Sequence, residues 1–279
     1  MKVSTLVLTY NEALNLPRCL RALSWCDDIV VIDSGSTDNT IEIAGKFGAR
    51  ILTRPFDNFA NQRNFGLEQG ELRHEWVLHL DADEVVTEAF VRRLLSLEPP
   101  RGIEGYRVPS KLMFGEKWLR HSGMYPNYQV RLGHRDRLRF VQVGHGQRES
   151  LPAENLETFD EPYLHYSFSH GLKHWFERHA AYAVAEAREL RLAREQNNFR
   201  WSELFHWDRT VRRRAAKAFS YRLPLFCRPS ARFCYVYFWR GGFLDGSIGF
   251  KYAYMLSIYE GMVAVAGSQP NSNAEAGPE

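Results

Sequence analysis

The sequence has few cysteines, and their spacing does not suggest a site. The four cysteines are Cys19, Cys26, Cys227 and Cys234, and no two of them form a CxxC pair. This spacing argues against a zinc knuckle and against a thioredoxin motif. We interpret them as reduced core or surface thiols, which are typical of a cytoplasmic protein.

Several other signals are absent. No apolar run reaches the length of about 18 residues that a membrane-spanning helix needs, so we expect no such helix. The first residues, MKVSTLVLTYNEA, lack the apolar core and cleavage site of a signal peptide. No GxGxxG follows the first expected strand, and GxxxxGK[ST] does not occur, which argues against a dinucleotide site and a P-loop.

The composition is that of an ordinary soluble globular protein. The chain has 279 residues, of which 44% are hydrophobic and 25% are charged. This length allows one large domain, or one domain with an appendage. A core of that size needs neither disulfides nor a structural metal for stability.

Strand and helix patterns alternate through the first hundred residues. Short apolar runs rich in β-branched residues predict strands at 3–9, 29–33, 49–53 and 76–80. Between and after them, helical spacing predicts helices at about 14–23, 36–47, 58–69 and 87–97. This order predicts an α/β fold with a Rossmann-like parallel sheet and right-handed crossovers.

The pattern changes after Pro99-Pro100. Strands are expected at 105–114 and 126–143, and helices at 169–196, 201–219 and 230–262 with a break near Gly241-Gly242. We therefore expect a nucleotide-binding half (1–98) and an acceptor half (99–168) in one domain, 1–168. A helical C-terminal region (169–266) and a disordered tail (267–279) would follow.

Acids and small polar residues follow three of the expected strands. They are TYNE at 9–12, DSGSTD at 33–38 and DADE at 81–84. Ligands of open α/β sheets bind at this edge, although Asp38 could simply cap a helix. If the strand continues through residue 83, Asp81 and Asp83 lie on the same side, and one of them can hold a metal. Oxygen ligands favour Mg²⁺ or Mn²⁺; Glu84 could instead turn away as a helix acid.

Four segments resemble successive motifs of the family-2 glycosyltransferases with the GT-A fold. They are LTYNEALNL, VVIDSGSTDNT, FANQRNFGLE and VLHLDADEVV, in order, over roughly residues 3–90. The resemblance implies a nucleotide-sugar pocket that is lined by Thr9, Tyr10, Asn11, Glu12, Asp33, Ser34, Asp38, Asp81 and Ala82. It also implies that Arg63 reaches the donor diphosphate or sugar and that Asp83 carries Mg²⁺ or Mn²⁺.

Later segments are similar to the WaaE-like glucosyltransferases of lipopolysaccharide core and capsule. They are VGHGQRESLP, EPYLHYSFSHGLKHWFERHAAYA and FLDGSIGFKYAYMLSIYEG. The resemblance points to Glu149 as the catalytic base, with His145 orienting it or contacting the diphosphate, although His145 could be the base itself. The sequence departs from the branch here, because His145 precedes Gly146-Gln147-Arg148 rather than a glutamate. His165 is expected near the diphosphate, or else as a core histidine.

These features predict an inverting, metal-dependent glycosyltransferase. It would move a hexose from a nucleotide-sugar, most simply a UDP-sugar, to a cell-envelope glycan or a lipid-linked saccharide. A sugar-phosphate nucleotidyltransferase is one alternative, but that class normally has a glycine-rich loop after the first strand, where this chain has TYNEALN. A non-catalytic membrane-surface glycan-binding protein is the other.

The region 200–260 is strongly basic. It holds eleven Lys and Arg residues and four acids (Glu203, Asp208, Asp245 and Glu260). No motif supports nucleic-acid binding, so a solvated face or a membrane-surface segment remains. Aromatic residues alternate with the arginines from Leu223 to Phe243, which favours an interfacial segment. We therefore predict a cytoplasmic protein, peripheral on the inner face of the cytoplasmic membrane.

Overall fold

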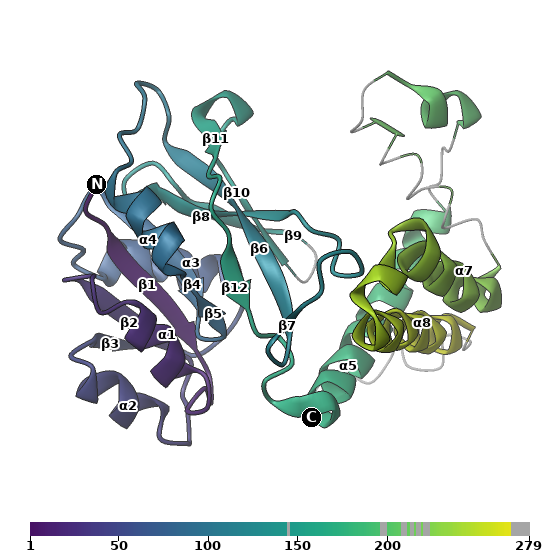
Figure 1. The fold of residues 1–279 in the computed structure, drawn as a ribbon, viewed down its shortest axis with the longest axis horizontal. Helices are drawn as coiled ribbons and strands as arrows, with labels where there is room; N and C mark the ends of the chain where they lie inside the picture. The colour runs from purple at the N-terminus through teal and green to yellow at the C-terminus, as the bar shows by residue number, and fades with distance from the viewer. Residues whose placement is uncertain are drawn as a thin grey trace. The chain divides into compact units, whose positions relative to one another are not determined.

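The computed structural model describes residues 1–143, 146–195, 200–207, 211–212, 215, 219 and 224–268. The chain divides into two compact units, Met1–His170 and Gly171–Glu279, which are coloured from purple to teal and from green to yellow in Figure 1. The first unit carries the sheet and the polar loops, and the second is helical. This matches the α/β class with a helical C-terminal region that the sequence predicts.

Four parallel strands form one half of the main sheet. They are β1 (Ser4–Thr9), β2 (Ile29–Asp33), β3 (Arg50–Thr53) and β4 (Trp76–Asp81), in the order β3-β2-β1-β4. All six residues of β1 are buried, which explains its uniformly apolar or small composition. The register places Thr9 opposite Asp33 and Leu8 opposite Asp81, so the three polar loops begin at one edge.

The second half of the sheet is mixed. Strand β8 (Asn127–His134) is antiparallel to β4, and β6 (Gly105–Phe114), β12 (Tyr163–His165) and β5 (Glu84–Val85) follow in that order. Strands β7 (Lys117–Trp118) and β11 (Leu156–Thr158) pair with β6. The expected strand 126–143 is therefore two strands. Its second part, β9 (Phe140–Val143), forms a separate hairpin with β10 (Gly146–Glu149).

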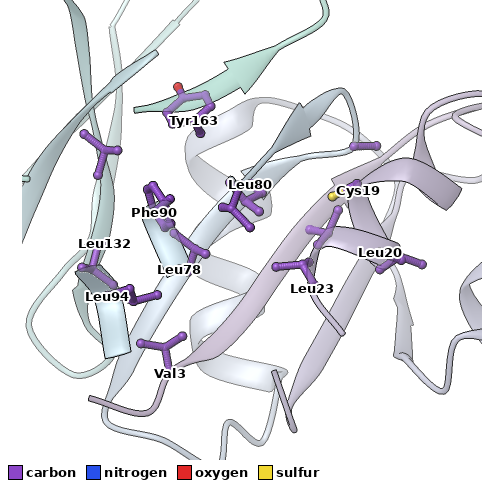
Figure 2. Close-up of a cluster of buried hydrophobic side chains, with 14 of the residues drawn as sticks. Val3, Cys19, Leu20, Leu23, Leu78, Leu80, Phe90, Leu94, Leu132 and Tyr163 are labelled. Atoms are coloured by element: carbon purple, nitrogen blue, oxygen red, sulfur yellow. The ribbon is translucent and has the colours of Figure 1, made fainter. Parts of the chain in front are cut away.

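Helices cover both faces of the sheet. Residues of α1 (Leu16–Ala22), α2 (Thr40–Lys46) and α4 (Glu88–Leu95) share one buried cluster with the strands. Figure 2 shows Leu20 of α1 and Phe90 of α4 in that cluster, beside Leu78 and Leu80 of β4. Helix α3 (Phe59–Gln69) contributes to a second cluster on the other face, with Leu6 of β1 and Ile32 of β2. The side chains of Asn58 and Thr87 cap α3 and α4.

Gly66 of α3 lies where the helix comes closest to the sheet. A Cβ atom there would stand 2.2 Å from Cδ1 of Ile32 and 3.0 Å from Cδ1 of Leu6. We expect Gly66→Ala to lower the free energy of unfolding by about 1–3 kcal/mol, because the buried core would be overpacked. The measurement is urea unfolding followed by far-UV circular dichroism.

Gly45 of α2 gives a matched control. It is also a helical glycine, but a Cβ there would meet nothing within 4 Å. Gly45→Ala should therefore be neutral or stabilising by up to about 1 kcal/mol, from helix propensity alone. Equal effects of the two substitutions would contradict the close approach of α3 to the sheet.

The second unit is built on two long helices and one short helix. They are α5 (Gly171–Glu195), α7 (Arg228–Cys234) and α8 (Ser247–Ser268). A π-helical turn (Tyr235–Trp239) and a 3-10 turn (Gly242–Asp245) connect α7 to α8. The second unit also contains 3-10 turns at Trp201–Phe205 and Leu225–Cys227, and the first unit contains one at Ala153–Asn155. Gly241 has φ +73°, so the predicted break near Gly241-Gly242 is confirmed.

Some expectations fall partly outside the described residues. Of the expected helix 201–219, the structure describes the 3-10 turn Trp201–Phe205 and a few isolated residues. Most of 208–223 lies outside, including Arg209, Arg213, Arg214, Lys217 and Arg222 of the basic region. Residues 269–279 of the tail also lie outside. Within the part that is described, no helix combines the length and apolarity needed to cross a bilayer.

Candidate functional site

Asp33 organises the loop after β2. It is fully buried, and its Oδ2 accepts hydrogen bonds from the backbone N–H of Gly35 (2.8 Å) and Ser36 (2.7 Å). Its Oδ1 accepts from the Thr9 hydroxyl at 3.1 Å. Both oxygens of Asp33 thus hold the loop in shape. The predicted contact of Asp33 with a nucleotide base stays a prediction.

The loops after β1 and β2 are tied together by side chains. Asn11, in the left-handed region at φ +53°, accepts a hydrogen bond from the N–H of Thr37 at 2.8 Å. Asp38 accepts from the N–H of Ala13 at 3.1 Å and of Thr40 at 3.0 Å. Asp38 therefore both fixes the first loop and orders the start of α2. The two interpretations of Asp38, capping and pocket-shaping, are compatible.

Tyr10 and Ser34 lie beside these loops. The Tyr10 side chain is 59% exposed, so its ring is available to a ligand. The Ser34 hydroxyl accepts a hydrogen bond from Nε2 of Gln62 at 2.8 Å, which connects the second loop to α3. The same edge thus carries one exposed aromatic ring and a network of fixed polar groups. These are features that a nucleotide pocket needs.

Asp81 bonds to buried arginines, although its own side chain is 31% exposed. Strand β4 ends at Asp81, so the condition under which Asp81 and Asp83 would lie on the same side of a strand is not met. A tight turn follows, because the Glu84 carboxylate accepts a hydrogen bond from the Asp81 N–H at 3.0 Å. Asp81 and Asp83 consequently have different partners.

Two arginines hold Asp81. Its Oδ1 accepts from Nη2 of Arg63 at 2.7 Å, and its Oδ2 accepts from Nη2 of Arg131 at 2.8 Å. Nη2 of Arg131 also donates to Glu84. The side chains of Arg63, Arg131 and Glu84 are 1%, 2% and 0% exposed. The cluster contains two cations and two anions, so its charges balance.

The pKa values of this cluster follow from burial and from the arginines. Burial disfavours the charge of Asp81, but Arg131 and Arg63 outweigh it and hold the pKa of that carboxyl well below its usual range. Burial raises the pKa of Glu84, against the lowering effect of Arg131. Burial and the two arginines lower the pKa of His79, which therefore stays neutral inside β4.

Arg63 lies behind Asp81, in the interior of the protein. Its Nε and Nη1 atoms are buried, and within the described structure they have no hydrogen-bond partner. The predicted contact of Arg63 with a diphosphate stays a prediction. The structure supports a different role, in which Arg63 positions Asp81.

Asp83 and His165 form the half-exposed pair of the site. Oδ2 of Asp83 is 3.3 Å from Nε2 of His165, and the two side chains are 20% and 28% exposed. Burial lowers the pKa of His165, but the adjacent Asp83 carboxylate outweighs it and raises the pKa of His165 to about 9. The pairing of β12 with β5 brings His165 here, in register with Glu84. Ala82, between the two aspartates, is buried.

Glu12 connects the first loop to the segment after β12. Its Oε2 accepts from Nδ2 of Asn15 at 2.7 Å and lies 3.1 Å from Nε2 of His170. Asn15 also donates to the Ser169 hydroxyl at 2.7 Å. Burial raises the pKa of Glu12, which Asn15 and His170 partly offset. Sequence reasoning assigns His170 only to the start of a helix, so it misses this contact.

Of the two candidate bases, Glu149 lies in a separate hairpin and His145 lies outside the described residues. Glu149 ends β10, opposite Phe140, in the separate β9–β10 hairpin. That hairpin approaches α3, because the Asn64 side chain bonds both the N–H and the carbonyl of Phe140. His145 lies outside the described residues. The roles predicted for Glu149 and His145 stay predictions.

Arg131 is the site residue that sequence reasoning missed. It lies in β8 between two buried apolar residues, Val130 and Leu132. An arginine inside such a strand pattern is a signal, because a buried charge needs a partner. The identity of the partner comes only from the antiparallel pairing of β8 with β4.

The N-terminal half of the chain matches a known protein family. Residues 4–145 match the model of a family described as glycosyl transferase family 2, and this covers half of the chain. The chain belongs to glycosyl transferase family 2. The family predicted from the sequence is confirmed, and the matched residues contain β1 to β4 and the loops described above.

Curated relatives match over part of their length. A Rickettsia felis protein named as an uncharacterized glycosyltransferase is 32% identical over 88 residues, which are 31% of this family-2 chain and 30% of that protein. The lipopolysaccharide core biosynthesis glycosyltransferase LpsC of Rhizobium meliloti is 33% identical over 115 residues, 39% of this chain and 42% of LpsC. The chain thus spans less than half of these relatives.

Solved structures give a fold-level likeness. The crystal structure of S. aureus TarS 1-349 has a TM-score of 0.46 and 17% identity, covering 96% of this chain and 90% of that one. Glucosyl-3-phosphoglycerate synthase from Mycobacterium tuberculosis, crystallised with Mn²⁺, UDP and glucosyl-3-phosphoglycerate, has a TM-score of 0.41 and 16% identity. The match covers 60% of this chain and 72% of that one.

Proposed function

We propose that this family-2 chain transfers a hexose from a UDP-sugar to a saccharide acceptor of the cell envelope, with inversion at the anomeric carbon. The observation that carries the proposal is the half-exposed Asp83–His165 pair, at the same sheet edge as the loops that Asp33 and Asp38 order. Family membership and similarity to a lipopolysaccharide core enzyme support it. Neither of these two observations supports assignment as a nucleotidyltransferase.

The donor set of this pair fits a divalent cation. Asp83 offers carboxylate oxygen, and His165 offers an imidazole nitrogen once a bound cation displaces its proton; both side chains are partly exposed. Mg²⁺ and Mn²⁺ accept such ligands and take their remaining ones from phosphate and water. Among the described residues no group of three or more His, Cys, Asp or Glu side chains could form a metal cage by itself. A bound nucleotide would therefore share the cation with the protein.

The side chains of this chain then have distinct tasks. Asp83 would hold a divalent cation, which when bound would supply Lewis-acid stabilisation of the charge on the departing diphosphate. Arg63 and Arg131 keep Asp81 fixed and ionised behind it. The hydrogen bond from the Asp81 N–H to Glu84 fixes the turn that carries Asp83, so this part of the site is preorganised before the donor binds.

The acceptor hydroxyl must lose a proton as it attacks the anomeric carbon. A carboxylate within hydrogen-bond reach can take it. We retain Glu149 for this task, with His145 beside it in sequence, and we propose that the β9–β10 hairpin borders the acceptor. Single displacement gives a product of inverted configuration, which nuclear magnetic resonance of the product can establish.

The site of action follows from the acceptor. We propose that the enzyme works in the cytoplasm at the inner face of the cytoplasmic membrane, where UDP-sugars and lipid-linked saccharides meet. The basic and aromatic second unit supports this proposal.

Donor binding can be tested by thermal shift. With Mn²⁺ present, UDP-glucose, UDP-galactose, UDP-N-acetylglucosamine, GDP-mannose and dTDP-glucose would be compared. We expect one UDP-sugar to raise the melting temperature by about 5–10 °C at a hundredfold excess over its Kd. If no nucleotide-sugar shifts the melting temperature, with or without metal, a non-catalytic glycan-binding protein becomes the better proposal.

A further inference from the structure

The connection between α7 and α8 presents a cluster of exposed aromatic and aliphatic side chains. We call these residues the aromatic tip: Phe238, Trp239, Phe243, Leu244, Phe250 and Tyr254. Trp239 is 84% exposed, Leu244 is 62% exposed and Phe238 is 60% exposed. Exposed apolar groups that are contiguous, rather than scattered, mark an interaction surface.

The tip is held by a rigid helical hairpin. Helices α7 and α8 lie side by side in Figure 1, and Arg228 forms a largely buried ion pair with Glu260 at 2.8 Å between them. The Ser257 hydroxyl donates to the Pro229 carbonyl at 2.9 Å. The inner side of the hairpin buries Val236, Ala253 and Leu256. The apolar residues of the tip are therefore fixed outward by a packed core on the opposite side.

Glycines shape the turn at the tip. Gly241 and Gly246 have φ +73° and +68°, conformations that other residues adopt only with strain. A Cβ on Gly249 would stand 1.9 Å from the carbonyl oxygen of Gly242, so α8 presses directly on the turn backbone. The turn carries Phe243 and Leu244. Both are at least 50% exposed.

The rings of the tip contact one another and rings beneath them. Tyr237 lies edge-on to Phe250 with centroids 5.6 Å apart, and Phe250 stacks on Tyr254 at 6.2 Å. Phe233 stacks on Tyr237 at 5.3 Å. Such a layer is ordered in advance, so binding to it costs little side-chain entropy.

Basic residues surround the tip. From Pro229 to Ile258 the cations are Arg232, Arg240 and Lys251, and Asp245 is the one acid. Lys251 is exposed, and Arg232 and Arg240 are half-buried. Aromatic rings with an apolar body suit the headgroup depth of a bilayer, and neighbouring cations suit anionic lipids. The charge complements an anionic lipid surface better than it complements a second, equally basic copy of this chain.

We propose that the aromatic tip docks the enzyme on an anionic lipid bilayer. Trp239, Phe238 and Leu244 enter the headgroup region, and Lys251 and Arg240 lie against lipid phosphates. The inference deepens the proposed function, because it names the surface that would hold the enzyme beside a lipid-linked acceptor. Lipid binding itself can be measured without donor, acceptor or turnover.

Vesicle flotation of the full chain tests the proposal. Vesicles of phosphatidylethanolamine with phosphatidylglycerol would be compared with vesicles of phosphatidylcholine alone. We expect binding to the anionic vesicles that weakens at high salt. Trp239→Ala with Leu244→Ala should lower the apparent affinity at least about tenfold, because apolar burial is lost. Arg240→Gln with Lys251→Gln should lower it about fivefold for each charge removed.

Phe47→Ala is the matched control. Phe47 is an aromatic residue of the first unit that is 40% exposed, and its substitution should leave vesicle binding unchanged. Equal flotation of wild type and the Trp239 and Leu244 variant would overturn the proposal. Loss of a dimer in light scattering, without any change in flotation, would assign the tip to a second copy and would also overturn it.

A measurement of nucleotide-sugar binding distinguishes the lipid-docking proposal from the proposed glycosyl-transfer function. The tip variants should keep the UDP-sugar thermal shift of the wild type, since their substitutions lie in the second unit. Vesicle binding without any nucleotide-sugar binding would contradict the proposed function alone. Nucleotide-sugar binding without vesicle binding would contradict the docking alone.

Discussion

Replacing Asp83 with asparagine is expected to lower the rate of glycosyl transfer by about 100- to 1,000-fold, the usual effect of losing one fixed electrostatic stabiliser. The Asp83 carboxylate is the acid of the site that pairs with His165, and Asn keeps its shape while removing the charge. The measurement is release of UDP from the donor that the thermal-shift panel identifies, with Mn²⁺ present.

Removal of the divalent cation by a chelator gives a second test of Asp83. EDTA should lower the wild-type rate to near that of the Asp83→Asn variant, and Mn²⁺ should restore only the wild type. The variant itself should respond little to EDTA. Asp136→Asn is the control, because Asp136 is an exposed acid after β8, with a side chain 66% exposed. A variant that keeps both wild-type turnover and metal dependence would remove Asp83 from the mechanism.

Replacing Arg131 with methionine is expected to lower the free energy of unfolding by about 3–5 kcal/mol. The substitution leaves the buried Glu84 and the partly exposed Asp81 with one arginine, Arg63, in the cluster. Desolvated charge without a partner is among the costliest single defects in a protein interior. Urea unfolding, monitored by circular dichroism, measures the loss.

A second substitution should recover part of that loss. Adding Glu84→Gln to Arg131→Met restores the charge balance of the cluster, so the double variant should be more stable than Arg131→Met alone. Arg137→Met is the control, because Arg137 is 67% exposed and its ion pair with Glu104, at 3.8 Å, should contribute at most about 1 kcal/mol. A double variant no more stable than the single one would show that the ionic cluster does not set the stability.

Local patterns predicted the elements of the first unit well. The apolar run IVVID could only be a strand buried on both faces, and it forms β2. The glycine in NQRNFG was part of a family resemblance, and the structure gives it a physical reason in the close approach of α3 to the sheet. The break at Gly241-Gly242 was also readable, since two adjacent glycines interrupt a helix.

The candidate site was predicted less completely. Side-chain alternation would place Asp81 and Asp83 together only if the strand continued to residue 83. The strand ends at Asp81, and the turn that follows gives the two acids different partners. Arg131 is 50 residues from Asp81 in sequence, and nothing local to either residue predicts their contact. Likewise, Glu12 and His170 are far apart in sequence, so no local pattern predicts the 3.1 Å contact between their side chains.

The sequence by itself determined the family, the α/β class and the edge of the sheet that carries polar loops, because hydrophobic periodicity and motif order are local properties of the chain. Only the tertiary structure decided which acid lies between two arginines and which one pairs with a histidine. That choice depends on β8 and β12, which come from distant parts of the chain and pair on either side of the turn. Burial and charge pairing, unlike periodicity, exist only once those strands have met.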